Sequence, residues 1–268
     1  MRVRAETAPS PPEDRGPLER DWPGRERRRP RIWDGNFLLL SAIARSLDEA
    51  VATYVPHGAA VLDVGAGAMP YYPLLAPVAS DYAGADINAA PGVRWVCTLE
   101  DLTAPDDSFD LVLCTQVLEH VRRPEEALRQ IARVLRPGGH AFVTTHGTYP
   151  FHPHPRDYWR WTQQGFEALF EDAGALELVE LVPHRGSVAC LAGLTANYVE
   201  MAATHARVGA LGRPAVLALN ALGLLGDRLA GRLRFPNEHT LITNFLAVGR
   251  KPAAASAPAS RRRTALPT

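Results

Sequence analysis

Two carboxylates and two glycines are spaced in a way that suits a nucleoside-like ligand. The run from Val61 to Gly67 reads VLDVGAG, in which Asp63 lies near the end of a short apolar segment and Gly65 and Gly67 follow it. Glycines at such a turn let the backbone approach a ligand closely. Asp86 ends the next apolar segment. We expect Asp63 to hold a ligand ammonium, directly or through water, and Asp86 to accept hydrogen bonds from both hydroxyls of a ribose.

The glycine pair by itself does not identify the ligand, because ordinary strand–helix turns and nicotinamide-binding turns share it. The nicotinamide fingerprint requires a third glycine three residues after the second, and this chain has Pro70 there. A pyrophosphate would also lie close to Asp63, where the negative charges repel each other. Both observations favour a ligand without phosphates.

A second set of reactive side chains lies in residues 146–162, which hold three histidines, one carboxylate, two arginines and five aromatic residues. A histidine can take the proton of a hydroxyl near neutral pH, so we expect His146 or His152 to act as a general base. The alternative is a rigid structural loop, in which Asp157 pairs with Arg160 and the tryptophans join the core.

Alternating short apolar runs and amphipathic helical patterns must position these side chains. Helical patterns occur at 37–55, 124–135 and 162–173. The alternation predicts an α/β fold with a mostly parallel sheet and helices on both faces. Ligands bind beyond the carboxyl ends of such strands, which predicts one shared edge for both sets of side chains. The expected strands are 59–64, 82–85, 93–97, 109–114, 140–145, 176–182 and 241–248.

Five motifs follow one another in a fixed order. They are VLDVGAG at 61–67, ADIN at 85–88, DDSFDLV at 106–112, VLEHV at 117–121 and VLRPGGHAFVTT at 134–145. In this order and spacing the chain resembles the class I S-adenosylmethionine-dependent methyltransferases, in particular the type 11 methyltransferase group. The resemblance implies a Rossmann-like, seven-stranded sheet and the cofactor S-adenosylmethionine.

The resemblance also implies a role for each matched residue. Asp86 would bind the ribose, Ile87 would pack on the adenine, and Gln116 would lie near the methionine moiety. Many members have an aspartate where this chain has Thr98, so the adenine amine is held by Thr98, by Asp101 or by backbone alone. The implied cofactor-binding residues are Asp63, Gly65, Ala66, Gly67, Asp86, Ile87, Thr98, Leu99 and Gln116.

In the same group, a loop with an HxxP…DYWRWT pattern precedes a helix, and its counterpart here is the histidine-rich segment. The resemblance therefore implies that this loop contacts the methyl acceptor. His120, in the VLEHV motif, either faces the acceptor or caps the following helix. The catalytic candidates are His146, His152 and His120, and the substrate-binding candidates are Tyr149, His154, Asp157, Tyr158 and Arg160.

We expect the acceptor to be a small molecule, methylated on a hydroxyl of a glycan, a lipid-linked compound or a natural product. The alternative is a non-catalytic S-adenosylmethionine-binding or interaction protein on the same fold. The formal net charge is zero and no basic stripe is interleaved with aromatic residues, so no nucleic-acid partner is expected. His152 and His154 have the spacing of a metal pair, but no obvious partner ligands accompany them, so no metal is expected.

Composition divides the chain into a central domain and two tails. Residues 1–32 and 252–268 are rich in proline, arginine or alanine and are expected to be disordered, which leaves 33–251 as the methyltransferase domain. The N-terminus has no apolar segment typical of a secretory signal, and the three cysteines form no CxxC pair. We therefore expect a cytoplasmic location.

A helical insert at 183–240 precedes the last strand. Helices are expected at 188–208 and 213–231, and the second is apolar on nearly every face, which predicts that it is buried. The insert is expected to form a lid over the site, or a homodimer or peripheral membrane contact through 188–231.

Overall fold

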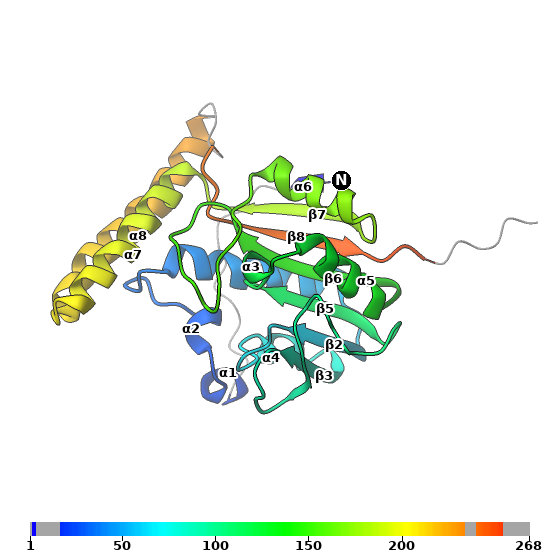
Figure 1. Cartoon of the computed structure of the whole chain (residues 1–268). Coiled ribbons are helices and arrows are strands. Elements are labelled where there is room, and N and C mark those ends of the chain that lie inside the picture. The colour runs from blue at the N-terminus through cyan, green and yellow to red at the C-terminus, as the bar shows by residue number, and fades with distance from the viewer. Residues whose placement is uncertain (1, 4–16, 234–239, 254–268) are drawn as a thin grey trace, which may run out of the picture.

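A mixed β-sheet forms the centre of the molecule in the computed structural model, which describes residues 2–3, 17–233 and 240–253 (Figure 1). The strand order is β1-β7-β8-β6-β5-β2-β3-β4, and β8 is antiparallel to its neighbours β6 and β7. The predicted seven-stranded, mostly parallel sheet is therefore confirmed, with the two-residue β1 as an added edge. The strands are β1 Arg2–Val3, β2 Ala59–Val64, β3 Ala79–Asp86, β4 Val93–Val96, β5 Phe109–Thr115, β6 Leu135–His146, β7 Glu177–His184 and β8 Asn244–Arg250.

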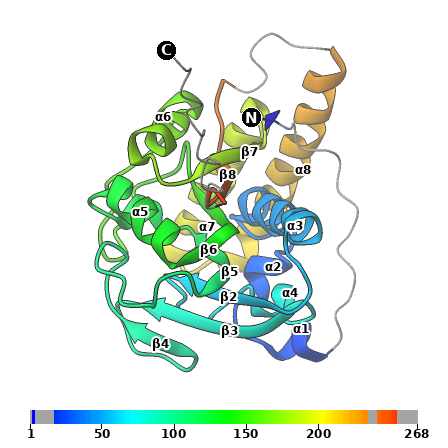
Figure 2. The same ribbon diagram turned by 90° about the vertical axis from the view of Figure 1, so that its right-hand side faces the viewer.

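Helices cover both faces of the sheet because successive side chains of a strand point to opposite faces (Figure 2). In β2, Val61 packs in the cluster that includes α3 (Phe37–Tyr54), and the neighbouring Leu62 packs in the cluster that includes α5 (Pro124–Val134) and α6 (Gln163–Ala173). The predicted helices on both faces are confirmed.

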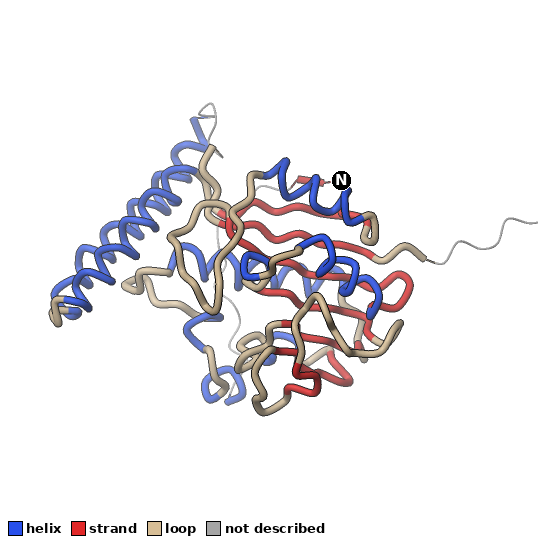
Figure 3. Tube along the Cα trace, in the orientation of Figure 1, coloured by secondary structure: helices blue, strands red, loops and turns tan. Residues whose placement is uncertain are grey.

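Residues close in the sequence set the ends of α5 and α6. α5 begins at Pro124 with two glutamates in its first turn, where they favour the helix dipole. Thr162 caps α6 by accepting a hydrogen bond from the Gly165 amide, and Gly174 ends it with a φ of 63°. The cap at Thr162 marks the point where the loop that carries the histidine-rich segment ends and α6 begins (Figure 3).

The prediction of a disordered arm over 1–32 is wrong from residue 17 onward; residues 1 and 4–16 lie outside the described residues. Helices α1 (Pro17–Asp21) and α2 (Arg25–Arg28) pack on the loop after β2. Arg28 is buried, forms an ion pair with Glu19 at 3.0 Å and donates a hydrogen bond to the Pro70 carbonyl. A buried, fully paired arginine can anchor a segment that has few apolar residues, which composition does not reveal.

The predicted insert helices are present as α7 (Ser187–His205) and α8 (Gly209–Leu233), which pair as a hairpin beyond the sheet (Figure 1). The prediction that the second helix is buried is wrong. Within α8 the buried residues are Val216, Asn220 and Gly223, whereas six of its leucines have large exposed fractions. The boundaries expected for the domain, 33–251, stay a prediction, and the predicted tail falls outside the described residues from 254 onward.

His184, at the end of β7, makes the stability of the fold sensitive to pH. It is completely buried, with Nδ1 at 3.2 Å from Asn244 Oδ1. Burial and the charge of Arg185 lower its pKa from 6.5 to about 3. Between these pH values the histidine binds a proton in the unfolded chain but not in the folded one. Its contribution to the free energy of unfolding is therefore fully present above pH 6.5 and is lost as the pH falls.

We expect the wild type to lose about 2 kcal/mol more unfolding free energy than His184→Gln between pH 7 and pH 5, from the pKa shift of this one group. Urea denaturation of both proteins at the two pH values measures this difference. Equal losses in both proteins would show that His184 does not control it.

Candidate functional site

The carboxyl ends of β2, β3 and β5 bring the predicted cofactor residues together. β2 pairs in parallel with both β3 and β5, so the turn after β2 lies between the ends of its neighbours. Gly65 and Gly67 in this turn have φ values of 65° and 50°, which glycine adopts without strain. A Cβ on Gly65 would lie 2.2 Å from Val117, whereas one on Gly67 would meet no atom within 4 Å. The backbone at Gly67 is therefore open to a ligand.

Asp86 is held in a fixed orientation at the end of β3. Its Oδ2 accepts a hydrogen bond from the Gly67 amide at 3.0 Å, and its Oδ1 accepts one from the Asn88 amide at 2.8 Å. Each carboxylate oxygen keeps a further lone pair. Two oriented acceptors fit the two adjacent hydroxyls of a ribose.

Asp63 is buried and its Oδ2 accepts a hydrogen bond from the Tyr82 hydroxyl at 2.7 Å. Burial raises the pKa of this carboxyl to about 7, against the effect of the Tyr82 hydrogen bond, and the nearby Asp86 raises it further. A buried carboxylate of this kind gains from a cationic partner. An ammonium such as that of a methionine moiety fits this requirement.

The remaining predicted cofactor residues line the same edge. Gln116 has a φ of 56°, donates to Thr144 Oγ1 and leaves its buried Oε1 without a hydrogen-bond partner. Ile87 is half exposed, as an adenine-stacking side chain must be before the ligand binds. Thr98 donates to Asp101 Oδ2 at 3.1 Å, so the two alternatives for the adenine amine are neighbours. Ala66 and Leu99 are buried next to these residues in the sequence.

The chemistry of this residue set fits S-adenosylmethionine. It offers a buried carboxyl for an ammonium, an oriented carboxylate for a ribose, an open glycine backbone and an unsatisfied amide oxygen. The negative charge of Asp63 disfavours a phosphate group close to it. The roles of the individual residues stay predictions.

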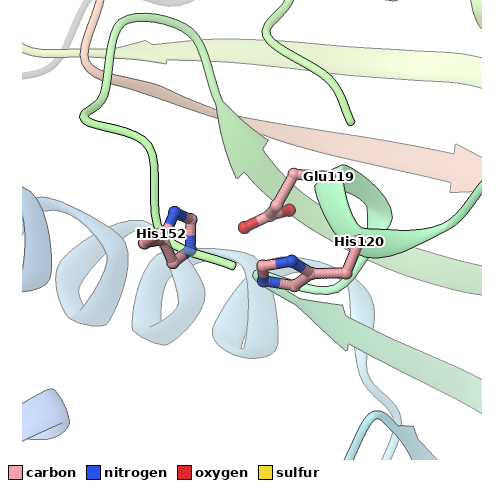
Figure 4. Close-up of side chains that lie close together, drawn as sticks. All are labelled: Glu119, His120 and His152. Carbon is pink, nitrogen blue, oxygen red and sulfur yellow. The ribbon is translucent and has the colours of Figure 1, made fainter. Parts of the chain in front are cut away.

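The candidate catalytic histidines converge beside Glu119, which follows β5. His120 and His152 lie on opposite sides of the Glu119 carboxylate (Figure 4). The ring centroid of His152 is 4.9 Å from that of His120 and 5.0 Å from that of His146. His146 stacks on Tyr149 at 4.1 Å. Side chains from β6, from the loop after it and from the turn after β5 thus form one cluster, which we call the histidine cluster.

Burial gives the members of the histidine cluster different protonation properties. It raises the pKa of Glu119, which is completely buried, to about 7 and lowers that of His146 well below 6.5. Glu119 Oε2 accepts from the Thr145 hydroxyl at 2.9 Å, and Oε1 lies 3.3 Å from His146 Nε2. Burial and the charge of His120 lower the pKa of His152 less, and the Asp157 carboxylate opposes that shift.

Asp157 and Arg160 hold the loop after β6 as an ion pair. This pair was expected from the sequence under the alternative of a rigid structural loop. Arg160 donates to both carboxylate oxygens of Asp157, at 2.5 and 2.7 Å, and to the carbonyls of Tyr149 and Pro150. Asp157 Oδ2 also accepts from the His152 amide at 2.9 Å. These contacts use most of the hydrogen-bonding capacity of both side chains, and their role in substrate binding stays a prediction.

The other residues predicted to bind the methyl acceptor differ in exposure. Tyr149 donates its hydroxyl to Asn36 Oδ1 at 3.0 Å and packs on His146. His154 and Tyr158 are exposed, and the Tyr158 hydroxyl accepts from Arg156 at 3.1 Å. The His120 Nδ1 is hydrogen-bonded to the Arg156 carbonyl, which orients that ring within the cluster.

Glu119, His120 and His152 are also the group that could hold a metal ion, because one ligand atom from each lies within 4.8 Å of the others. A tetrahedral zinc site requires ligand atoms about 3.3 Å apart, given bonds of about 2.0–2.1 Å. The group would have to contract to bind such an ion.

Glu119 is the functional candidate that sequence reasoning did not select. Its position in VLEHV is visible, but a glutamate in a turn is normally a solvated side chain, and only the fold shows that it is buried among histidines. Tyr82 and Asn36 were missed for the same reason, since their partners Asp63 and Tyr149 are distant in the sequence.

Comparison with known proteins gives a consistent result. The model of a family described as a methyltransferase domain matches residues 27–177. The ubiquinone biosynthesis O-methyltransferase of Aeromonas salmonicida is 33% identical over 103 residues, which are 33% of this chain and 43% of the relative. The protein of the same name from Aliivibrio fischeri is 28% identical over 141 residues, or 47% of this chain and 54% of the relative. The chain thus spans about half the length of these relatives.

Solved structures share the fold at low sequence identity. The cyclase SpnF has a TM-score of 0.52 and 21% identity, with 78% of this chain and 81% of that chain covered. A Bacillus halodurans protein described as a methyltransferase has a TM-score of 0.51 and 16% identity, with 78% and 100% covered. The similarity supports the fold alone, because it extends to a protein named for a different reaction.

Proposed function

Because the chain belongs to the class I S-adenosylmethionine-dependent methyltransferases, we propose that it methylates a hydroxyl of a small molecule bound at the histidine cluster. The observation that carries the proposal is the cluster itself. In it, His152 lies beside the ring of His146 and beside the carboxylate of Asp157. The names of the relatives, which are O-methyltransferases, support a hydroxyl acceptor.

His152 is the residue that we assign as general base. Its side chain is 27% exposed, so an acceptor can reach it, whereas that of His146 is 3% exposed. Its Nδ1 lies 3.5 Å from Asp157 Oδ2, a carboxylate that favours the protonated ring. His146 and Tyr149 pack against His152 and fix its ring, so they act as positioning residues.

The reaction requires alignment and a proton acceptor. When bound, S-adenosylmethionine supplies an electrophilic methyl group on a sulfonium. His152 removes the proton of the acceptor hydroxyl as the oxygen forms its bond to the methyl carbon and the carbon–sulfur bond breaks. Holding the two reactants in line can supply about 7–11 kcal/mol of the barrier reduction. The proton then leaves from the exposed side of the His152 ring to solvent.

A transfer assay with S-adenosylmethionine labelled in its methyl group tests the proposal. The acceptors are phenols, sugar alcohols, lipid-linked alcohols and, as a contrast, primary amines, each with and without a chelator. We expect label in hydroxyl acceptors and equal rates with chelator, because proton transfer by His152 requires no metal. Label in amines alone would contradict the choice of hydroxyls, and loss of activity with chelator would assign the cluster to a metal.

We also propose that no nucleic acid is a partner, since the formal net charge is zero. The non-catalytic alternative predicts binding of S-adenosylmethionine without transfer to any acceptor. It is contradicted if any of these acceptors becomes labelled at a rate above the protein-free control.

A further inference from the structure

The hairpin of α7 and α8 carries an apolar surface that the rest of the described chain does not cover. On α8 it consists of residues spaced three or four apart, which places them on one side of the helix. Leu222, Leu225 and Leu229 are 56%, 55% and 45% exposed. The stripe on α8 comprises Leu211, Ala215, Ala218, Leu222, Leu225, Leu229 and Leu233, all exposed.

A second exposed stripe runs along α7 and includes Val188, Leu191, Tyr198 and Met201. The stripe on α8 faces away from the domain, because Asn220 on the opposite side of that helix holds contacts with it. The stripe on α7 is exposed along its length, although Met201 lies one turn from a residue that contacts the domain. Asn197 on α7 donates to Asn36. We call these two exposed stripes together the hairpin surface. They belong to the helical hairpin that projects beyond the sheet (Figure 1).

Charge distinguishes the possible partners of this surface. The hairpin, residues 187–233, has two acidic residues, and both are turned toward the domain. Asp227 accepts hydrogen bonds from the amides of Gly186 and Ala189, and Glu200 lies against Gly35. No acidic side chain of the described hairpin accompanies the exposed stripes.

Four arginines belong to the hairpin, and two of them lie directly beside the leucine stripe. Arg228 and Arg232 each follow a stripe leucine by three residues, which places them next to it on the helix. Arg207 and Arg213 lie near the tip between the helices. Two identical hairpins would bring arginines together without acidic partners, whereas an anionic lipid surface would neutralise them.

We propose that the hairpin surface binds the interface of a membrane that contains anionic phospholipids. Apolar side chains flanked by arginines are the arrangement that such an interface binds. The hairpin that carries this surface lies next to the acceptor loop, since Asn36 Oδ1 accepts hydrogen bonds from both Asn197 and Tyr149. Delivery of a membrane-embedded acceptor to His152 rests on the proposed function, whereas binding to the membrane does not.

α8 is also, by length and composition, long and apolar enough to cross a membrane. The contacts of its inner side favour a position in the plane of the interface instead. Asn220 donates to the carbonyls of Ile32 and Asp34 at 2.7 and 3.0 Å, and Asp227 caps α7. Insertion across a bilayer would break these hydrogen bonds and leave the polar groups unsatisfied.

Sedimentation of the full chain with vesicles tests the proposal. We expect binding to vesicles of phosphatidylcholine and phosphatidylglycerol that decreases with salt, and weak binding to phosphatidylcholine alone. Leu222→Glu and Leu229→Glu are each expected to weaken binding roughly tenfold or more. Arg232→Ser should weaken it about fivefold.

Leu217→Glu is the matched control, because this leucine is exposed on α8 but lies outside the stripe. It should bind vesicles like the wild type, and circular dichroism should show equal helix content in all variants. Absence of vesicle binding by the wild type would overturn the proposal. So would a dimer, seen by light scattering, that Leu222→Glu dissociates while vesicle binding stays absent. Neither result depends on methyl transfer.

Discussion

Asp86→Ala is expected to weaken the binding of S-adenosylmethionine by roughly 10²- to 10³-fold. The fixed carboxylate offers one free lone pair on each oxygen to a ribose hydroxyl. Hydrogen bonds to a charged acceptor contribute about 1.5–3 kcal/mol each, and two at the lower end of this range, about 1.5–2 kcal/mol each, correspond to about 3–4 kcal/mol. Calorimetric titration with S-adenosylmethionine and with its demethylated product measures the change.

Asp81→Ala is the matched control for this measurement. Asp81 belongs to the same strand but is exposed and pairs with Arg94 at 2.5 Å, and exposed ion pairs contribute little to stability. The control should bind both compounds like the wild type. Asp86→Asn should fall between the wild type and Asp86→Ala, because it keeps one oxygen acceptor. Wild-type affinity in Asp86→Ala would remove the ribose role from this carboxylate.

His152→Ala is expected to lower kcat/KM for a hydroxyl acceptor by about 10²- to 10⁴-fold, the usual contribution of a general base. Binding of S-adenosylmethionine should not change, because His152 lies outside the proposed cofactor residues. Steady-state rates and calorimetry on the same protein separate these effects. His57→Ala, which removes an exposed histidine in the loop before β2, serves as the control and should keep wild-type rates.

The pH profile distinguishes a base from a merely structural histidine. Burial and neighbouring charges lower the pKa of His152 below 6.5, so kcat/KM should rise with pH through a midpoint below 6.5 and level off at neutral pH. The Asp157 carboxylate raises this pKa, and Asp157→Asn should therefore move the midpoint to lower pH. A midpoint that stays in place in Asp157→Asn would assign the titration to another group, such as Glu119.

The local features of the fold could be predicted from the sequence because they depend on neighbouring residues. The central strands β2 and β5 are apolar runs that end at a turn, and a buried parallel strand requires only that pattern. Asp63 and Asp86 end adjacent strands, so their shared edge follows from strand order. The cap at Thr162 and the stop at Gly174 likewise depend on a few residues of local sequence.

The histidine cluster could be predicted only in part. The sequence placed His146 and His152 in one loop and left the role of His120 open between the acceptor and a helix cap. The fold brings His120 and His152 together although they are separated by a long stretch of chain. It also buries Glu119, and burial rather than residue type gives that carboxyl its raised pKa.

The sequence alone therefore determined which residues are apolar, which are charged and in what order they follow one another. It could not determine which surfaces become covered, because burial depends on partners distant in the sequence. Residues 17–28 looked disordered, yet Arg28 and Glu19 bury each other against the loop at Pro70. α8 looked like a core helix, yet its leucines remain exposed. Tertiary contacts decide both cases, since the free energy of burying a side chain depends on what it packs against.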